Sequence, residues 1–272
     1  MKLGRAVLGT RFRLQSVLIS TASVSASLPS PTARLAQLLR GAERTVVLTG
    51  AGMSTESGLP DFRGEGGLWK QNRRFEELAS VQALLGEYRE FVEFYRWRLH
   101  TLAQARPNLG HALLADWQRR GLIHTLVTQN VDGFHEQAGS QGVLCLHGSL
   151  RRIHCHRCEV EAPSSAFQLG HEPSCGSCGG RLRPSLVLFG ESLDSGVLGD
   201  AFQASARADL FLVLGSSLLV SPANSLPRIA LERNSAKLVI VNREPTQYGG
   251  LATLDIRGSI GETLAAVERE LG

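Results

Sequence analysis

Four cysteines, arranged in two Cys-x-x-Cys pairs, constrain this chain more than any other feature of its sequence. The pairs are Cys155/Cys158 and Cys175/Cys178, and sixteen residues separate them. Each pair of this kind sits on a tight turn and can aim two thiolates at one tetrahedral ion. Because four thiolates leave no position for a bound water, we predict one structural zinc ion. Two disulfides or free thiols are the alternative. The fifth cysteine, Cys145, lies in an apolar run and is predicted to be buried in a strand.

The rest of the chain alternates short apolar runs with segments of helical spacing. The apolar runs lie at Thr45–Thr49, His124–Thr128, Val143–Leu146, Leu186–Phe189, Leu210–Leu214 and Lys237–Val241. Strand-like runs that alternate with helices predict an α/β fold with a doubly wound parallel sheet. Ligands of such sheets bind at the carboxyl ends of the strands, so the residues that follow each run are the first candidates for a site.

Length and charge narrow the classes of protein that remain. A chain of 272 residues can form one large domain with a small inserted module. Residues 1–42 carry six Lys or Arg and no acid, so the remainder holds 23 basic against 25 acidic residues. That balance argues against a nucleic-acid-binding body, and we expect no direct nucleic-acid binding. No stretch approaches the roughly 20 apolar residues that cross a bilayer, so we expect no membrane span.

Residues 1–31 form a flexible basic extension in our interpretation, because they lack acids and are rich in Ser and Thr. This composition is typical of an organellar transit peptide, but it also fits a disordered tail or extra residues upstream of the functional start. Thiolate zinc ligands favour a reducing compartment. We therefore expect a cytoplasmic protein, with the mitochondrial matrix as the alternative if the segment is a transit peptide.

Glycine-rich and polar segments follow several of the predicted strands. Gly50-Ala51-Gly52 can let the backbone approach a diphosphate, although a simple tight turn would have the same sequence. Further polar segments lie at 128–133, 215–217 and 241–244. His147 follows an apolar run and precedes a glycine, so it can face the same crevice. An imidazole titrates near neutrality, which suits a general base.

In combination, these segments resemble the sirtuins, the NAD-dependent protein-lysine deacylases, over residues 33–270. The order and joint presence of the motifs make the resemblance specific, whereas any one of them would not. As they stand here, the motifs are Gly50-Ala-Gly-Met-Ser-Thr-Glu-Ser-Gly-Leu-Pro-Asp-Phe-Arg63, Thr128-Gln-Asn-Val-Asp-Gly-Phe-His135, His147-Gly148, the four paired cysteines, Phe189-Gly190-Glu191, Gly215-Ser-Ser-Leu218 and Val241-Asn242.

The resemblance implies a catalytic domain over residues 32–272 with two lobes. The large, Rossmann-like lobe would comprise residues 32–63, 107–150 and 184–272. The small lobe would combine a helical insertion at 64–106 with a zinc-ribbon-like module at 151–183. NAD and an acyl-lysine protein or peptide would meet in the cleft between the lobes, and we expect a monomer.

The resemblance also implies a reaction that yields nicotinamide, deacylated lysine and O-acyl-ADP-ribose. His147 would take a proton from a ribose hydroxyl, while Asn130 would hold the nicotinamide and its ribose. Phe62 would shield the reacting face from water. The residues implied to contact NAD are Gly50, Ala51, Gly52, Ser54, Asp61, Phe62, Arg63, Gln129, Asn130, Asp132, Gly215, Ser216, Ser217, Asn242, Arg243, Glu244 and Ile260.

The substrate peptide would add as a strand between two loops, which gives affinity through backbone hydrogen bonds. Tyr95 and Arg98 match a Tyr-x-x-Arg pair that, in one sirtuin subgroup, grips succinyl or malonyl carboxylates. That subgroup generally has Ala where this chain has Thr55. We therefore favour deacetylation over desuccinylation or demalonylation. The residues implied to contact the substrate are Tyr95, Arg98, Phe189, Gly190, Glu191, Leu219 and Val220.

Two other functions use the same motifs. Protein ADP-ribosyl transfer shares the cleavage of NAD but passes the ADP-ribose to another acceptor. A non-catalytic NAD sensor would need only the binding residues. The intact set of Asn130, Asp132 and His147 favours deacylation over both.

Overall fold

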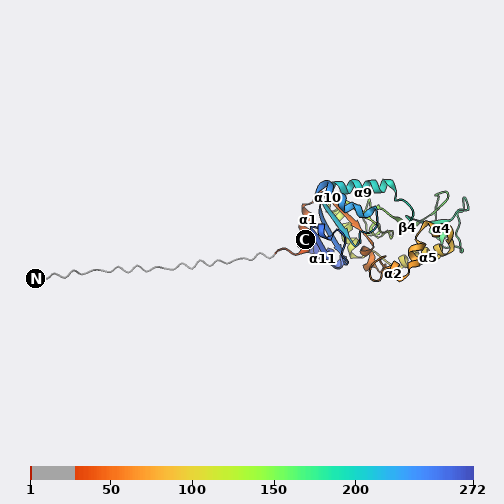
Figure 1. The fold of residues 1–272 in the computed structure, drawn as a ribbon, viewed down its shortest axis with the longest axis horizontal. Helices are drawn as coiled ribbons and strands as arrows, with labels where there is room; N and C mark the ends of the chain where they lie inside the picture. Colours follow the sequence, from red (N-terminus) through yellow and green to blue (C-terminus); the bar gives the residue numbers. More distant parts are fainter. Residues whose placement is uncertain (2–27) are drawn as a thin grey trace.

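A computed structural model describes residue 1 and residues 28–272 (Figure 1). Our interpretation of residues 1–31 therefore falls mostly outside the described residues. The first helix, α1, begins at Pro31, and the Ser30 side chain caps it by accepting from the backbone N–H of Ala33.

Strands and helices alternate along most of the chain. The strands are β1 (Thr45–Thr49), β2 (Thr125–Thr128), β3 (Leu144–Cys145), β4 (Gly148–Cys155), β5 (Glu161–Ala162), β6 (Leu182–Leu186), β7 (Leu210–Leu214), β8 (Lys237–Asn242) and β9 (Leu254–Arg257). The helices are α1 (Pro31–Gly41), α2 (Leu68–Gln71), α3 (Arg73–Leu78), α4 (Val81–Gly86), α5 (Tyr88–Gln104), α6 (Leu109–Arg119), α7 (Phe134–Gln137), α8 (Ser164–Phe167), α9 (Ser195–Arg207), α10 (Leu226–Asn234) and α11 (Ile260–Leu271).

Six parallel strands form the large sheet, in the order β3-β2-β1-β7-β8-β9. Strand β1 pairs with β2 on one side and with β7 on the other, so the strand order reverses direction at β1. Adjacent connections leave this point toward opposite faces of the sheet, which opens a crevice beyond the carboxyl ends of the two strands. The prediction of a doubly wound parallel sheet is confirmed.

Helices cover both faces of the large sheet. Leu35 of α1, Trp117 of α6 and Leu264 of α11 belong to one buried cluster with the sheet residue Leu212. Helices α9 and α10 pack together on the opposite face, where Ala201 and Ala230 are fully buried. In Figure 1 this second pair lies at the top of the view, opposite α11. The inner strands β1 and β7 are thus buried on both faces, which explains their continuous apolar runs.

A second group of elements lies at the other end of the molecule, where Figure 1 labels α2, α4, α5 and β4. Strands β5, β4 and β6 form an antiparallel sheet in that order, and helices α2–α5 pack beside it. Their shared core includes Phe91 and Tyr95 of α5, Ile153 of β4 and Phe167 of α8. The 64–106 segment contains the four helices, and most of the small sheet falls within 151–183.

One predicted strand, Leu186–Phe189, is wrong. The strand in this region is β6, which ends at Leu186 and pairs antiparallel with β4 in the small sheet. Beyond it, the backbone N–H groups find separate partners: Val187 N–H donates to the His147 carbonyl, and Phe189 N–H donates to that of Ala79. The apolar run reflects burial of Leu188 rather than strand pairing. Sequence analysis also missed strands β4, β5 and β9.

The predicted burial of Cys145 needs correction as well. Cys145 does lie in a strand, β3, but this strand is only two residues long and forms an edge of the large sheet. The side chain is half-buried, and its Sγ donates to Glu136 Oε1 at 3.1 Å. Among the described residues, no helix combines the length and apolarity that a membrane crossing would require.

Candidate active site

A cavity of about 1000 Å³ lies beyond the carboxyl ends of β1, β2, β7 and β8. Its walls include segments that are far apart in the sequence, from Gly50 after β1 to Ile260 at the start of α11. All the residues that the sequence analysis assigned to NAD or to the acyl-lysine substrate line this one cavity. The four cysteines do not line it.

Two glycine turns meet at the point where the strand order reverses. Gly50 N–H donates to the Leu214 carbonyl at 3.0 Å, and Gly52 N–H donates to that of Gly215 at 2.9 Å. A Cβ on Gly50 would lie 2.7 Å from the Gly215 oxygen. Gly215 itself has φ +65°, which disfavours other residues. The turns therefore require glycine for close backbone contact, and they leave the start of the 3-10 helix Ala51–Ser57 facing the cavity.

A buried polar cluster connects β1 and β2 on the cavity floor. Ser54 Oγ donates to Asp132 Oδ2 at 2.7 Å, and Asn130 Nδ2 donates to the Gly50 carbonyl at 3.0 Å. Gln129 Nε2 donates to Ser216 Oγ at 2.8 Å across to the loop after β7. Burial raises the pKa of Asp132 above its ordinary value, although hydrogen bonds from Phe134 N–H and Ser54 oppose the shift. The cluster presents fixed amide and carboxyl groups to a ligand in the cavity.

His147 reaches the cavity from the turn between β3 and β4. Its Nδ1 lies 2.9 Å from the Gln129 carbonyl oxygen. Since a carbonyl oxygen only accepts, the hydrogen-bond network assigns the ring proton to Nδ1 and leaves Nε2 with a free lone pair. Burial lowers the pKa of His147 below its ordinary value, while the bond to the Gln129 carbonyl opposes this shift. The neutral ring can therefore accept a proton at Nε2 near physiological pH.

Another part of the cavity wall brings aromatic rings together with Arg98. The Phe62 and Trp69 rings lie 4.9 Å apart, and the Arg98 guanidinium lies 5.4 Å from the Phe62 ring centre. Arg98 forms no ion pair with an acidic side chain within the part of the chain that the structure describes. Burial lowers its pKa and raises the pKa of the neighbouring Tyr95 to about 12, so Tyr95 stays a hydroxyl donor. Thr55 directs its own hydroxyl to the Gly52 carbonyl at 2.9 Å.

The loop after β6 is held by a buried ion pair that sequence analysis did not find. Arg183 is 3% exposed, and its Nη2 donates to Glu191 Oε2 at 2.8 Å. The same carboxylate oxygen accepts from Leu188 N–H at 2.8 Å. Arg183 therefore fixes the loop that carries Phe189 and Gly190 at the cavity mouth. The Arg-Pro sequence gave no spacing signal that could pair it with Glu191.

Two other features behind the cavity were missed. Arg151 Nε donates to the Asp132 carbonyl at 2.6 Å and its guanidinium lies 5.8 Å from the Phe134 ring centre. Thr49 Oγ1 donates to Thr128 Oγ1 at 2.8 Å and also lies 2.9 Å from His135 Nε2. Burial lowers the pKa of His135 to about 3, so the ring stays neutral. Buried His and Thr in a strand sequence give no signal of their partners.

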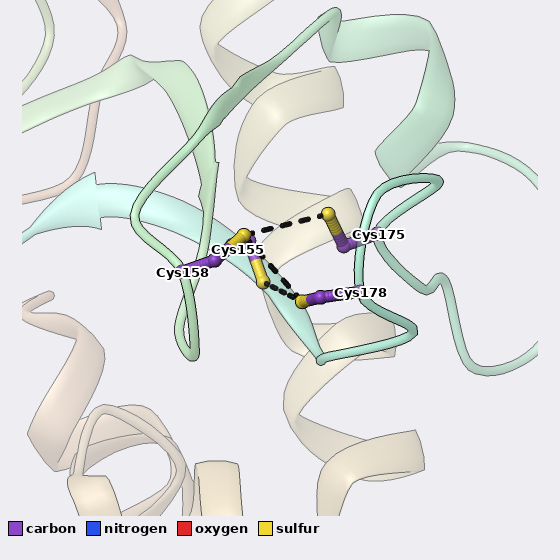
Figure 2. A group of neighbouring side chains, drawn as sticks. All are labelled: Cys155, Cys158, Cys175 and Cys178. Carbon is purple, nitrogen blue, oxygen red and sulfur yellow. Dashed lines mark hydrogen bonds between the residues drawn. The ribbon is translucent and has the colours of Figure 1, made fainter.

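The four paired cysteines gather at one point beside β4 and β6 (Figure 2). Their sulfur atoms all lie within 4.8 Å of one another, with Cys155–Cys178 at 3.5 Å and Cys158–Cys175 at 3.8 Å. These separations are far longer than the ~2.05 Å of a disulfide bond. Four thiolates ~2.3 Å from one tetrahedral zinc would lie about 3.8 Å apart, so the geometry fits that ion. A zinc here would hold the loops of the small lobe and would take no part in chemistry.

The parallel sheet, the interlocked glycine turns and the polar groups around the crevice define a dinucleotide-binding α/β protein. Comparison with known families gives a match between residues 50–222 and the Sir2 family. The chain belongs to the Sir2 family.

Relatives of known name cover most of the chain. It is 55% identical over 237 residues to "NAD-dependent protein deacetylase 1" of Geobacillus kaustophilus, a match that covers 86% of this chain and 96% of that protein. It is 40% identical to the "NAD-dependent protein deacylase" of Aeropyrum pernix, covering 87% of this chain and 96% of that protein. Among solved structures, a Sir2–p53 peptide–NAD+ complex has a TM-score of 0.78 and 38% identity, covering 87% of this chain and 97% of that chain.

Proposed function

We propose that this protein removes acyl groups from protein lysines in an NAD-dependent reaction, and that acetyl is its preferred acyl group. The observation that carries the proposal is the single cavity lined by His147, Asn130 and Asp132 together with Tyr95 and Arg98. Family membership and the names of the relatives support the deacylase activity. The products would be nicotinamide, the deacylated lysine and O-acyl-ADP-ribose.

The cavity residues contribute mainly orientation. Asn130 and Asp132 would hold the nicotinamide and its ribose against the acyl oxygen, and holding two weak reactants in line removes much of the entropic barrier. The glycine turn at Gly50 and Gly52 offers backbone N–H groups to the diphosphate. The aromatic ring of Phe62 would exclude water while the bond to nicotinamide is broken.

His147 would act after this first step. Its Nε2 can take the proton of a ribose hydroxyl, whose oxygen then attacks the carbon that came from the acyl group. The bond from Nδ1 to the Gln129 carbonyl keeps the ring in the tautomer that this role needs. Simple transfer of ADP-ribose to another acceptor does not use such a base, so an intact His147 favours deacylation.

The substrate peptide would lie between two loops at the cavity mouth. Phe189 and Gly190 form one side, and Leu219 and Val220 form the other. Leu219 is 63% exposed and Phe189 is 42% exposed. The backbone N–H and carbonyl of Phe189 already bind Ala79 and Val81, so an added strand would pair with the neighbouring residues of the two loops. Backbone pairing of this kind gives affinity with little sequence selectivity.

The acetyl preference depends on the part of the cavity wall that includes Thr55 and Arg98. Thr55 narrows the pocket relative to an alanine, and the relatives of about half or more identical residues are named deacetylases. Arg98, which has aromatic neighbours but no acidic partner among the described residues, favours the alternative of a succinyl or malonyl group.

Steady-state kinetics on matched acetyl- and succinyl-lysine peptides decide between the two. We expect faster turnover of the acetyl peptide, with nicotinamide release as the readout. The Arg98→Met variant should keep acetyl turnover if the proposal is right, whereas a selective loss of succinyl turnover would identify Arg98 as a carboxylate ligand. Much higher kcat/KM for succinyl in the parent enzyme would overturn the acetyl preference. Mass spectrometry of the products separates deacylation from ADP-ribosyl transfer.

We further propose that the protein is a monomer that binds one structural zinc ion and works in the cytoplasm. The cysteine geometry supports the metal, and the reducing compartment that thiolate ligands need supports the location. Metal analysis and light scattering of the purified protein test the first two statements. Fractionation of cells that express the full chain, including residues 1–31, tests the third.

A further inference from the structure

We propose that a groove beside the acyl-lysine cavity binds an acidic side chain of the substrate, a few residues from the modified lysine. This inference rests on the proposed deacylase function and names the kind of substrate it selects. The groove has a volume of about 760 Å³. The residues that line it are Arg63, Trp69, Lys70, Arg73, Glu76, Glu77 and Phe189.

An aromatic wall joins the groove to the acyl-lysine cavity. Arg63, Trp69 and Phe189 line both hollows. The Trp69 ring lies 4.9 Å from that of Phe62 on the cavity side and 6.3 Å from that of Phe189. A peptide that places its acyl-lysine in the cavity and passes Phe189 therefore reaches the groove without leaving the surface of the protein.

The groove is also attached to the backbone of the substrate loop. Phe189 N–H donates to the Ala79 carbonyl at 2.9 Å, and Val81 N–H donates to the Phe189 carbonyl at 3.0 Å. These bonds tie the loop to the junction between α3 and α4. The basic residues before this junction thus keep a fixed distance from the loop beside which the substrate would lie.

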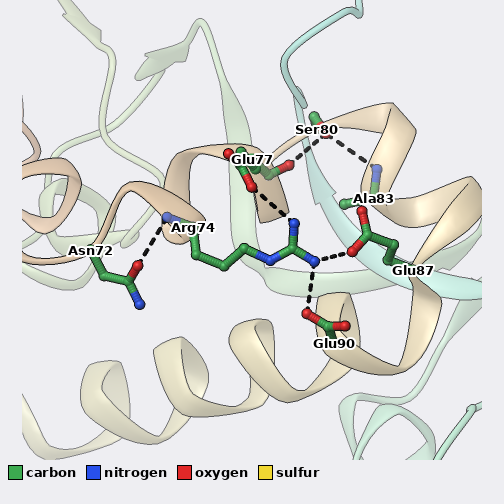
Figure 3. Close-up of polar contacts among 7 residues, drawn as sticks. All are labelled: Asn72, Arg74, Glu77, Ser80, Ala83, Glu87 and Glu90. Atoms are coloured by element: carbon green, nitrogen blue, oxygen red, sulfur yellow. Dashed lines mark hydrogen bonds and ion pairs between the residues drawn. The ribbon is translucent and has the colours of Figure 1, made fainter.

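The charge of the groove is positive after its own ion pairs are counted. Glu77 pairs with Arg74 at 2.9 Å, and the same guanidinium also binds Glu87 and Glu90 of the α4–α5 region (Figure 3). Because Arg74 is shared among three carboxylates, Glu77 keeps part of its negative charge, and the groove is lined by three cations and two acids.

Among the described residues, Arg63, Lys70 and Arg73 form no ion pair, and Glu76 is the remaining acid without one. Three cations therefore line the groove with two carboxylates, Glu76 and the partly paired Glu77, beside the aromatic side chains of Trp69 and Phe189. Lys70 and Arg73 are exposed and stay hydrated, so neither needs an acidic partner within the protein. A carboxylate of the substrate is the group that this arrangement fits best, and a basic substrate residue is disfavoured.

Peptide kinetics test the proposal directly. One acetyl-lysine peptide is varied to Glu, Gln or Lys at each of about four positions on either side of the lysine, a reach of ~13 Å in an extended chain. We expect at least one position at which Glu raises kcat/KM over Lys by about three- to tenfold, mostly through KM, because several exposed charges each contribute a little. The preference should shrink as salt is added, since exposed charges are screened beyond about 10 Å at 0.1 M.

Charge reversal supplies the variant and its control. The double variant Lys70→Glu and Arg73→Glu should invert the preference at the same position while keeping turnover of the Gln peptide. The matched control is Arg233→Glu with Lys237→Glu, which reverses two exposed cations, one in the last turn of α10 and one at the start of β8. The control should leave the preference unchanged.

Two outcomes separate this inference from the proposed function. Efficient turnover with the same rate for Glu, Gln and Lys at every position, or an equal effect of both double variants, overturns the groove and leaves the deacylase intact. Fluorescence anisotropy of labelled peptides tests the groove even if the protein has no deacylase activity. If no peptide is turned over, tighter binding of the Glu peptide that is lost in the Lys70→Glu, Arg73→Glu variant still supports the groove, and equal binding of all three peptides refutes it.

Discussion

The ion pair between Arg183 and Glu191 allows a quantitative test of how the substrate loop is held. The Arg183 side chain is 4% exposed and that of Glu191 is 26% exposed. Replacing Glu191 with Gln keeps the shape of the side chain but removes the charge that faces a buried guanidinium. The hydrogen bond from Leu188 N–H can persist to the amide oxygen, whereas the amide NH2 cannot accept from Arg183 Nη1, so the change removes the charge and one hydrogen bond.

The size of the effect follows from burial. Breaking a buried ion pair by removing one partner costs about 3–5 kcal/mol, because the remaining charge is left uncompensated. Arg183 keeps the carbonyl oxygens of Leu186 and Pro184 as acceptors, and Glu191 is partly solvated. We therefore expect a loss of about 2–3 kcal/mol in the free energy of unfolding, below the usual range. For a domain of this size that is a fall in Tm of ~4–12 °C.

The pH dependence adds a second signature. Burial alone would raise the pKa of Glu191, but hydrogen bonds from Arg183 and Leu188 N–H prevail and hold the pKa below its ordinary value. A carboxyl with a depressed folded-state pKa stabilises the fold above its unfolded value of about 4.3, and this stabilisation is lost as the pH falls through the folded value. The difference in Tm between wild type and Glu191→Gln should therefore be full near neutrality and shrink in acid.

Thermal unfolding followed by circular dichroism measures the effect, and peptide kinetics measure its consequence. We expect a higher KM for the acetyl peptide with a smaller change in kcat, because in our proposal the loop would contact the peptide and not the ribose. The Arg183→Met, Glu191→Gln double variant should be more stable than the sum of the single losses predicts. A Glu191→Gln protein that melts like wild type at every pH would refute the reasoning.

Three further predictions concern other parts of the site. In the pH profile of kcat, the fall in rate on the acid side should have its midpoint below pH ~6.5, because the lowered pKa of His147 keeps the general base neutral to more acidic pH. A midpoint above that value contradicts the assignment of His147 as the base. We expect the Cys155→Ser variant to lose its zinc, measured by metal analysis, and to unfold in the small lobe. The Cys145→Ser control should keep its zinc and its folded small lobe. Arg151→Met should raise the KM for NAD about fivefold by freeing the Asp132 carbonyl, an effect of ~1 kcal/mol that Arg152→Met should lack.

Much of the fold could be read from the sequence because its signals are local. A strand such as Leu210–Leu214 is buried on both faces, so it appears as an unbroken apolar run. The four paired cysteines can likewise be recognised from the Cys-x-x-Cys spacing within each pair. The same rule failed at Leu186–Phe189, because burial of a loop against the small-lobe core produces the same apolar pattern as a strand.

The residues of the candidate site likewise fall into those with a local sequence signal and those without one. The residues that follow each strand could be grouped in advance, since parallel strands bring their carboxyl ends to one edge. Contacts such as Arg183 with Glu191, or Arg151 with the Asp132 carbonyl, could not. They join the small sheet to loops whose distance from it is set by packing, and neither residue carries a spacing signal. The groove beside Phe189 has the same origin, because it depends on where α3 meets the substrate loop.

A steric clash between two side chains can be relieved by a smaller residue at the neighbouring position. The meeting of Gly50 and Gly52 with Gly215 allows no such repair, because a methyl group there would strike main-chain atoms on the opposing turn. A substitution at any of the three would have to push apart two neighbouring strands of the central sheet. Engineers who wish to alter this enzyme should therefore keep these three positions fixed and place their diversity in the helices of the small lobe.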